Sequence, residues 1–373
     1  MKALCHREGL LAACQLASVA TATRDVKPVL KSLKAIVEPE RCTLMATDLE
    51  IGIRLEVRSV RVEEPGEAIL PTTKLISILR EATDEELTIE AGPDTCIVRG
   101  QFNEFEMPGE DPAIFPDVPA FAEEKYHEMS AGVLREMIRR TAFATAAEPA
   151  KFGATTGVLW ELEDGKARLV ATDGRRLALT EGLATAHGGH STKGQAPVVP
   201  AKAMSLLERN LQEEDELVQV SLRPNEVLIK TERAMIYSRL VEGRFPDYRR
   251  VIPQKASAKI PLTVGPFHTA VKQAAIMTDD KESKRVVFTF AKKKLTLEAR
   301  GPASGRSHVE LPLEYDGKSI EISFDPKYLT EMLRVLDPEA HLTLELEDGG
   351  KPALFKNETG DYQYVVVPLV VKE

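Results

Sequence analysis

The spacing of hydrophobic positions changes repeatedly along the chain between a period of two and a helical period. Short alternating segments, typical of half-buried strands, separate six longer segments whose apolar residues recur three and four positions apart. Asp-Gly dipeptides between the alternating segments favour tight antiparallel hairpins. With about two helices per group of strands, the pattern predicts an α+β protein and disfavours a doubly wound parallel sheet. The predicted helices cover residues 8–21, 72–82, 132–145, 201–211, 265–277 and 326–336.

The same order of elements occurs three times. Three similar strand segments contain Leu44, Leu169 and Leu297, which lie 125 and 128 positions apart. A proline opens the helical segment downstream of each strand, where its missing N–H group leaves no hydrogen bond unmade. These prolines are Pro71, Pro200 and Pro326. The chain therefore consists of three copies of one unit of about 125 residues.

The boundaries between the units follow from composition. Residues 107–119 contain four prolines, as expected for a stiff connector. Its Phe115-Pro116-Asp117 motif returns as Phe245-Pro246-Asp247 at the second boundary. We expect three domains with boundaries near 123 and 255. They cover residues 1–123, 124–255 and 256–373.

Charge sharpens this division. The 373 residues include 49 Lys plus Arg and 58 Asp plus Glu, a net charge of −9, which argues against a general basic coat for nucleic acid. The six predicted helices, however, contain ten basic and five acidic residues, so the acidic surplus belongs to strands and loops. Basic helical faces with few aromatic residues suit sequence-independent contact with a duplex backbone.

Common catalytic motifs are missing from the sequence. It contains no phosphate-binding G-x-x-x-x-G-K-[ST], no G-x-G-x-x-G, no H-E-x-x-H and no G-x-S-x-G. His187 and His190 lie in a Gly-rich segment that we interpret as a surface loop rather than a metal site. Four cysteines without a C-x-x-C pair, and the lack of a signal peptide or membrane-length apolar segment, indicate a cytoplasmic protein with reduced thiols. We expect no catalytic site, cofactor or metal.

Three segments resemble one family. They are A-T-D-G-R-R-L-A at 171–178, L-V-E-G-R-F-P-D-Y-R-R-V-I-P at 240–253 and Y-V-V-V-P-L at 364–369, and together they resemble the bacterial DNA polymerase III β subunit, the sliding clamp family, over the whole length. The resemblance implies three DNA-clamp units of two helices on antiparallel sheets. It also implies a head-to-tail homodimer that forms a six-domain ring, with helices lining the hole and sheets outside.

The function implied by the resemblance is not enzymatic. A clamp is a replication processivity factor that encircles double-stranded DNA without sequence specificity and acts at the nucleoid in the cytoplasm. The implied partners are the catalytic subunit of DNA polymerase III with its 3'-5' exonuclease complex, a clamp-loader complex that uses ATP, and other clamp-binding proteins. Those others include repair polymerases, mismatch-repair proteins and ligase, and no membrane is involved.

The resemblance also assigns site residues. An apolar pocket between domains two and three would accept a short partner peptide that carries Gln and hydrophobic anchors. Its residues are Thr155, Thr172, Gly174, Arg175, Arg176, Leu177, Pro246, Arg250, Val251, Pro352, Val365, Val366, Val367, Pro368 and Leu369. The expected DNA contacts are Arg24, Lys74, Arg80, Arg135, Arg139, Lys151 and Lys202. The expected dimer contacts are Phe105, Met107, Ile276, Met277, Arg300 and Arg306, in a seam where Glu104, Glu106 and Glu110 face the two arginines.

Two departures from the family pattern leave alternatives open. The chain continues past Leu369 for four residues, and Pro149, Gly153 and Ala154 stand where some members place aromatic residues facing DNA. A paralogous clamp that serves a repair polymerase is one alternative. A peptide-binding scaffold that never encircles DNA is another, because the same pocket would serve it. Closed-dimer formation separates the scaffold from a clamp.

Overall fold

The computed structural model describes residues 1–23, 27–58, 60–148, 154–278, 284–301 and 304–369. The chain divides into two compact units, each built from segments that are separate in the sequence. The first unit contains Met1–Val133, Ala184–Ser191 and Lys202–Leu240. The second contains Leu134–Leu183, Thr192–Ala201 and Val241–Glu373. Pairing between the described strands is antiparallel throughout, as the hairpin signals predict.

The first unit contains two sheets. The smaller has the order β5-β1-β7-β8-β9 and leaves β9 at one edge. Its strands are β1 (Lys2–His6), β5 (Val60–Glu64), β7 (Glu86–Ala91), β8 (Thr95–Arg99) and β9 (Glu104–Pro108). The larger has the order β14-β10-β16-β17-β18-β4-β3-β2-β6, so β18 and β4 join two of the repeats into one sheet. Its strands are β2 (Leu33–Glu38), β3 (Arg41–Thr47), β4 (Ile51–Val57), β6 (Gly66–Leu70), β10 (Tyr126–Ser130), β14 (Thr185–His187), β16 (Leu217–Leu222), β17 (Glu226–Lys230) and β18 (Ala234–Arg239).

The second unit repeats this arrangement. Its larger sheet has the order β15-β11-β12-β13-β26-β25-β24-β19, and the β13–β26 pair, with Leu177 opposite Val365, joins two repeats. Its strands are β11 (Gly157–Glu163), β12 (Lys166–Thr172), β13 (Arg176–Gly182), β15 (Val198–Pro200), β19 (Ala258–Thr263), β24 (His341–Leu346), β25 (Ala353–Asn357) and β26 (Tyr362–Val366). The smaller sheet has the order β22-β21-β20-β23 and leaves β22 at an edge. Its strands are β20 (Val286–Ala291), β21 (Lys294–Gly301), β22 (Gly305–Pro312) and β23 (Ile320–Phe324).

Within the part of the chain that the structure describes, six α-helices form close to the predicted positions. They are α1 (Arg7–Ser18), α2 (Thr72–Glu81), α3 (Ala131–Thr141), α4 (Ala201–Asn210), α5 (Val264–Ala275) and α6 (Pro326–Leu333). The helices end one to four residues before the predicted ends, and after α3, which ends four residues early, the chain continues as a 3-10 turn over Ala142–Ala144. The other 3-10 turns cover Pro28–Lys31, Pro112–Ile114 and Tyr248–Arg250.

The helix starts correct one detail of the proline prediction. Pro326 occupies the first position of α6, where the Asp325 carboxylate accepts a hydrogen bond from the N–H of Lys327 at 3.0 Å. Pro71 and Pro200 instead lie one residue before α2 and α4. Pro200 is the last residue of β15, and Pro71 follows β6 with extended backbone, so neither proline occupies the first position of its helix.

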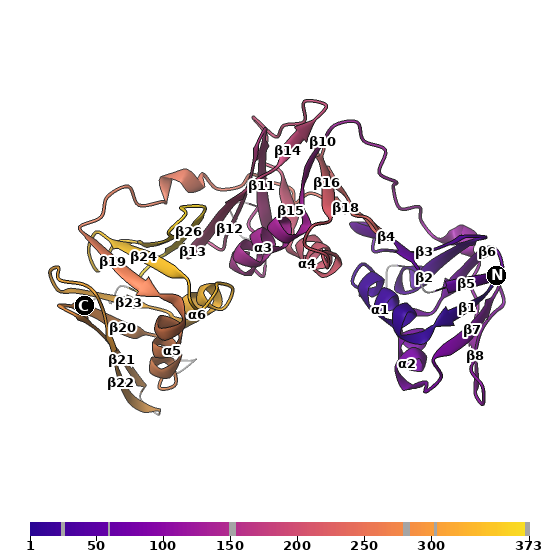
Figure 1. Cartoon of the computed structure of the whole chain (residues 1–373), viewed down its shortest axis with the longest axis horizontal. Coiled ribbons are helices and arrows are strands. Elements are labelled where there is room, and N and C mark those ends of the chain that lie inside the picture. Colours follow the sequence, from indigo (N-terminus) through magenta and orange to yellow (C-terminus); the bar gives the residue numbers. More distant parts are fainter. Residues whose placement is uncertain (24–26, 59, 149–153, 279–283, 302–303, 370–373) are drawn as a thin grey trace. The chain divides into compact units, whose positions relative to one another are not determined.

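The helices bury an apolar face and expose a polar one. In α2, Leu75 and Leu79 are fully buried while Lys74 and Arg80 are exposed, as the helical period predicts. The helix α1 packs beside α2, and α5 packs beside α6 (Figure 1). Among the described residues, none of the helices has the length and apolar composition needed to cross a membrane.

Candidate functional site

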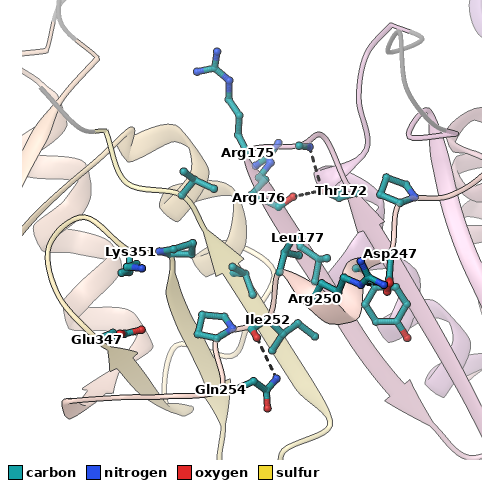
Figure 2. A pocket seen from close by; sticks show the side chains of 18 of the residues that line it. Thr172, Arg175, Arg176, Leu177, Asp247, Arg250, Ile252, Gln254, Glu347 and Lys351 are labelled. Atoms are coloured by element: carbon teal, nitrogen blue, oxygen red, sulfur yellow. Dashed lines mark hydrogen bonds and ion pairs between the residues drawn. The ribbon is translucent and has the colours of Figure 1, made fainter. Parts of the chain in front are cut away.

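A pocket of about 540 Å³ lies within the second unit, where β13 meets β26 and the segment that follows Phe245. Figure 2 shows side chains converging on the pocket from β13, from the segment after Phe245 and from the loop between β24 and β25. Eleven of the predicted pocket residues line it: Thr172, Gly174, Arg175, Arg176, Leu177, Pro246, Arg250, Val251, Pro352, Val365 and Val367.

The turn between β12 and β13 builds one wall. The hydroxyl of Thr172 donates to the carbonyl oxygen of Arg176 at 2.6 Å and accepts from the N–H of Gly174 at 3.1 Å. The carboxylate of Asp173 accepts from the N–H groups of Arg175 and Arg176 at 2.9 and 3.1 Å. Gly174 has a φ of 85°, in the left-handed region that favours glycine. These bonds fix the backbone beside the pocket.

The two arginines of this turn have different environments. Arg176 is 6% exposed, pairs with Asp173 at 3.0 Å and with Glu331 of α6, and donates to the carbonyl oxygen of Phe143 at 2.8 Å. Its guanidinium also lies 4.8 Å from the ring centroid of Tyr328. Arg175, in contrast, is exposed and extends away from the strand (Figure 2). Arg176 therefore holds α6 and the turn after α3 against β13, whereas Arg175 is accessible to a ligand.

The segment after Phe245 builds the opposite wall. Phe245 and Tyr248 are 5% and 3% exposed and belong to the same apolar cluster as Leu177 and Val365. The hydroxyl of Tyr248 donates to Glu161 at 2.9 Å. The anchored Tyr248 leaves the next apolar residue, Val251, 52% exposed at the pocket.

A cluster of ion pairs and hydrogen bonds around Glu161, called the ion cluster below, holds this wall in place. Glu161 accepts from Arg168 at 2.8 Å, from Tyr248 and from Arg249 at 2.7 Å. Burial opposes the ionisation of Glu161, but these hydrogen bonds outweigh it and lower the pKa of the carboxyl. Burial, together with the bond to Glu161, raises the pKa of Tyr248 to about 12. At neutral pH a carboxylate and a neutral phenol therefore hold the segment in place.

Four predicted residues do not line the pocket. Val366 is fully buried on the other face of β26, because successive side chains of a strand point to opposite faces and Val365 and Val367 occupy the pocket side. Leu369 instead donates its N–H to Ser323 at 2.8 Å, and Pro368 beside it is buried. Thr155 is 4% exposed and its carbonyl accepts from the N–H of Ala146 at 2.8 Å.

Sequence reasoning missed eight lining residues: Asp247, Tyr248, Ile252, Pro253, Gln254, Lys255, Glu347 and Lys351. The first six continue the second F-P-D segment, whose apolar residues beyond Val251 were a usable signal. Glu347 and Lys351 come from the hairpin between β24 and β25, which only the folded sheet brings to the pocket. They add one negative and one positive charge to the rim (Figure 2).

The predicted DNA contacts are only partly accessible. With the observed helix bounds, the helices still contain ten basic and five acidic residues. Lys74, Arg80 and Arg139 are exposed, whereas Arg135 is half-buried and Lys202 pairs with Asp48 at 2.5 Å. The prediction treated all of these bases alike and did not identify that pair. Arg24 and Lys151 lie outside the described residues, as do Pro149, Gly153 and the last four residues.

The predicted dimer contacts lie at two sheet edges and one helix end, except Arg300, which is on β21, the second strand of its sheet. Phe105 and Met107 are on β9, 38% and 7% exposed. Arg306 is exposed on β22, and Ile276, directly after α5, is 70% exposed. Met277 is half-buried and Arg300, on β21, is exposed.

The prediction that His187 and His190 lie together in a surface loop is wrong for His190. This residue is 8% exposed, and its Nδ1 lies 2.7 Å from Nδ1 of His127 on β10. Burial lowers the pKa of His190, against the effect of a hydrogen bond with the backbone of Leu222. The described residues contain no group of three or more His, Cys, Asp or Glu side chains able to hold a metal ion. Cys5, Cys14, Cys42 and Cys96 are buried free thiols.

The repeated helix-and-sheet unit and the pocket define a protein of the DNA-clamp fold. Three family models cover the chain: the N-terminal, central and C-terminal domains of the DNA polymerase III beta subunit match residues 1–119, 128–247 and 249–370. The chain belongs to the DNA polymerase III beta subunit family.

Individual relatives agree with this assignment. The beta sliding clamp of Pseudomonas putida is 30% identical over 370 residues, which cover 98% of both chains. A solved structure of the DnaN sliding clamp from Pseudomonas aeruginosa bound to griselimycin is 28% identical, with a TM-score of 0.89 and complete coverage of both chains. The sliding clamp of Bacillus subtilis, at 23% identity and a TM-score of 0.91, shows the similarity of fold.

Proposed function

We propose that this protein is a DNA sliding clamp, a processivity factor without a catalytic site of its own. Two copies would join head to tail into a ring of six domains around duplex DNA and tether DNA polymerase III and other proteins to it. The observation that carries this proposal is family membership over all three domains of the chain. We place the domain boundaries near 123 and 255 and the protein at the nucleoid in the cytoplasm.

The charge of the helices supports sliding contact with DNA. A small surplus of exposed bases, Lys74, Arg80 and Arg139 among them, attracts phosphates without holding one sequence. We expect K74A with R139A to narrow the range of salt concentrations in which the loaded protein stays on circular DNA. Lys166 and Lys259 lie on strands and provide a matched control pair. An equal effect of both pairs would contradict a DNA-facing role for the helices.

The decisive test of the clamp itself is topological. An ATP-dependent clamp loader should leave the protein on nicked circular DNA, and cutting the circle should release it. Retention on linear DNA without blocked ends would contradict encirclement and favour ordinary binding. If the protein were released on cutting but were a monomer in solution, a ring of two chains would likewise be contradicted. A peptide-binding scaffold would fail the first step, because it would not be retained on the circle.

The pocket supports partner tethering. Leu177, Val365 and exposed Val251 provide apolar surface, and the rim contains Arg175 and Lys351. An extended peptide with hydrophobic anchors and a glutamine could bury the anchors there while the polar rim fixes its direction. The catalytic polymerase subunit, the clamp loader, repair polymerases, mismatch-repair proteins and ligase are the partners we propose for it.

A single charge tests the pocket. We expect V251D to weaken binding of such a peptide, measured by fluorescence anisotropy, by about 100-fold, because the new carboxylate would have to lose water inside an apolar contact. Leu217 on β16, 58% exposed and outside the pocket lining, provides the matched control L217D. Equal affinities of V251D and the wild type would contradict this site.

A further inference from the structure

The turn between β8 and β9 presents the most exposed large hydrophobic side chain among the described residues. Phe102 is 90% exposed, more than Leu183 at 80% or Ile276 at 70%. Single exposed apolar residues are common, and exposure alone does not indicate a contact. Two further features indicate a contact site. The turn is held in one conformation by hydrogen bonds, and it lies next to an edge strand.

The turn is held in one conformation. The N–H of Gly100 donates to the carbonyl oxygen of Asn103 at 2.9 Å. The carboxylate of Asp84, from the loop before β7, accepts from the N–H of Gln101 at 2.9 Å and from the side-chain amide of Asn103 at 3.0 Å. These bonds lower the pKa of Asp84. A Cβ atom at Gly100 would collide with the Asp84 carboxylate and the Asn103 side chain, so a larger residue there would displace the two side chains that hold the turn.

Phe102 is thus displayed by a fixed turn directly before β9. This strand is the edge of the five-stranded sheet and has β8 as its one neighbour in that sheet. A free strand edge pairs readily with another strand, and Phe105 next along β9 is also partly exposed. The apolar surface therefore extends from the turn along the strand edge.

A second copy of this chain offers a surface that fits this edge. β22 is the edge of the four-stranded sheet in the second unit and contains exposed Arg306, while Ile276 lies exposed at the end of α5. The β9 edge contains exposed Glu104 and Glu106. At the start of β22, exposed Arg306 pairs with Glu298 and lies opposite exposed Arg300 of β21, so this end of the sheet keeps a basic surplus, whereas exposed Glu310 lies toward the far end of the strand. Carboxylates at one edge and a basic surplus at the other attract each other.

We propose that Phe102, preset by Asp84, is an anchor of the seam between two copies of this chain and is buried against the second copy. This inference rests on the proposed head-to-tail dimer and assigns it a contact residue beyond Phe105, Met107, Ile276, Met277, Arg300 and Arg306. A rigid aromatic side chain gains apolar burial without losing much conformational freedom on binding. Asp84 acts as a positioning residue, because it touches the turn and not the partner.

The test is the dimer dissociation constant, measured by sedimentation velocity. We expect F102A to raise it about tenfold or more, as for an aromatic contact at an interface. F102L should keep most of the affinity, and D84A should raise the constant by a smaller factor because the turn loses two of its bonds. Leu183 is matched in exposure and belongs to the loop between β13 and β14, not to either edge strand, so L183A should leave the constant unchanged.

A covalent readout separates a contact from an indirect effect. A photoreactive phenylalanine analogue at position 102 should crosslink two copies, whereas the same analogue at position 183 should not. An F102A dimer of wild-type affinity, or no crosslinked dimer from position 102, would overturn the role of Phe102 while leaving the ring intact. A wild-type protein that stays monomeric would instead overturn the proposed head-to-tail assembly. Thermal unfolding of each variant checks that the first unit remains folded.

Discussion

In the first joint between repeats, the segment at residues 115–121 packs Val118 against Gly52, at the end of the turn at residues 47–52. In the second joint, residues 245–252 stand beside the equivalent turn at residues 172–177 and leave a pocket. Both segments begin with Phe-Pro-Asp, and both bury the phenylalanine. The shared motif of the two joints therefore does not by itself produce a binding site, and the difference must come from particular residues.

The turns themselves are nearly identical in their hydrogen bonds. Asp48 accepts from the N–H groups of the residues two and three positions later at 3.0 and 2.8 Å, as Asp173 does at 2.9 and 3.1 Å. The hydroxyl of Thr47 bonds to the carbonyl of Ile51 at 2.8 Å, in the manner of Thr172 and Arg176. The backbone is thus not what separates the joints.

The residue after the turn differs. Gly52 has no side chain, and a Cβ atom there would lie 2.8 Å from Cγ1 of Val118. The first segment therefore closes onto the strand, and Val118 is 1% exposed. At the same place in the second joint, Leu177 has a large side chain, and Tyr248 takes the place of Val118. A side chain in place of hydrogen keeps the second segment away from its strand, which leaves room for a ligand.

Replacing Leu177 by glycine, the residue at the equivalent position of the first joint, should have the largest effect on stability. L177G removes a side chain that is 2% exposed, and large-to-small changes of buried leucine lower the free energy of unfolding by about 2–5 kcal/mol. Added backbone freedom places the loss near the top of this range. The fluorescence of buried Trp160, in the same unit, reports the unfolding by urea. L183G, at an exposed loop position, should change the free energy by less than about 0.5 kcal/mol, and equal losses in both variants would contradict the packing role of Leu177.

The reverse exchange tests the first joint. G52L places a side chain against Val118 and should lower the free energy of unfolding by about 1–3 kcal/mol, as overpacking does. Hydrogen exchange of β4 amides reports the stability of this joint. Adding V118A should restore part of the loss, because it removes the atoms that clash. Failure of V118A to restore any stability would show that the close approach is not the reason for glycine at this position.

A third comparison concerns the ion cluster behind the second segment. E161Q should lower the free energy of unfolding by about 1 kcal/mol at pH 7, because a half-exposed charged network contributes modestly. The pKa of Glu161 is lower in the folded protein than in the unfolded chain, so this contribution is present above the unfolded pKa. It is lost as the pH falls through the folded pKa.

The pH dependence provides the measurement for that cluster. We expect the difference between wild type and E161Q, followed by urea unfolding, to shrink steadily below about pH 4.3, the usual pKa of glutamate. K356A alters an ion pair elsewhere in the same unit and controls for general acid effects. A difference that stays constant down to pH 2 would mean that the glutamate charge does not stabilise the segment.

The local pattern of apolar and turn residues was sufficient to predict much of the fold. Helical periodicity located α2 and α6 because their buried leucines recur on one helical face. The Asp-Gly turns at 164–165, 173–174 and 348–349 located hairpins, whereas the hairpin expected at Asp316-Gly317 is wrong, because this turn joins β22 to β23 and these strands pair with other strands. Family-like motifs located the turn at Thr172 and the valines of β26. Alternation along that strand could also have separated Val365 from Val366, since neighbouring residues of a strand cannot face the same pocket.

Other parts of the site depend on distant segments and could not be predicted in this way. Lys202 is an ordinary basic residue in sequence, and its pair with Asp48 arises from contact between segments 154 positions apart. Glu347 reaches the pocket through the pairing of β24 with β25. The buried contact of His190 with His127 likewise requires the folded first unit, so a Gly-rich neighbourhood suggested a surface loop.

The smallest expected effects come from the two turns. Both turns contain a residue with a positive φ, but this residue is a leucine in the first joint and a glycine in the second. Leu49 has a φ of 77° and Gly174 a φ of 85°, and a side chain in this left-handed region raises the energy by about 1–2 kcal/mol. Glycine avoids that strain, but it lowers the free energy of unfolding by about 0.5–1 kcal/mol because its backbone is freer in the unfolded chain. L49G should therefore raise the free energy of unfolding by at most about 1 kcal/mol, and G174A should lower it by a similar amount. Urea unfolding of the two variants measures both changes, and shifts of the same sign would show that the two turns do not carry the same backbone strain.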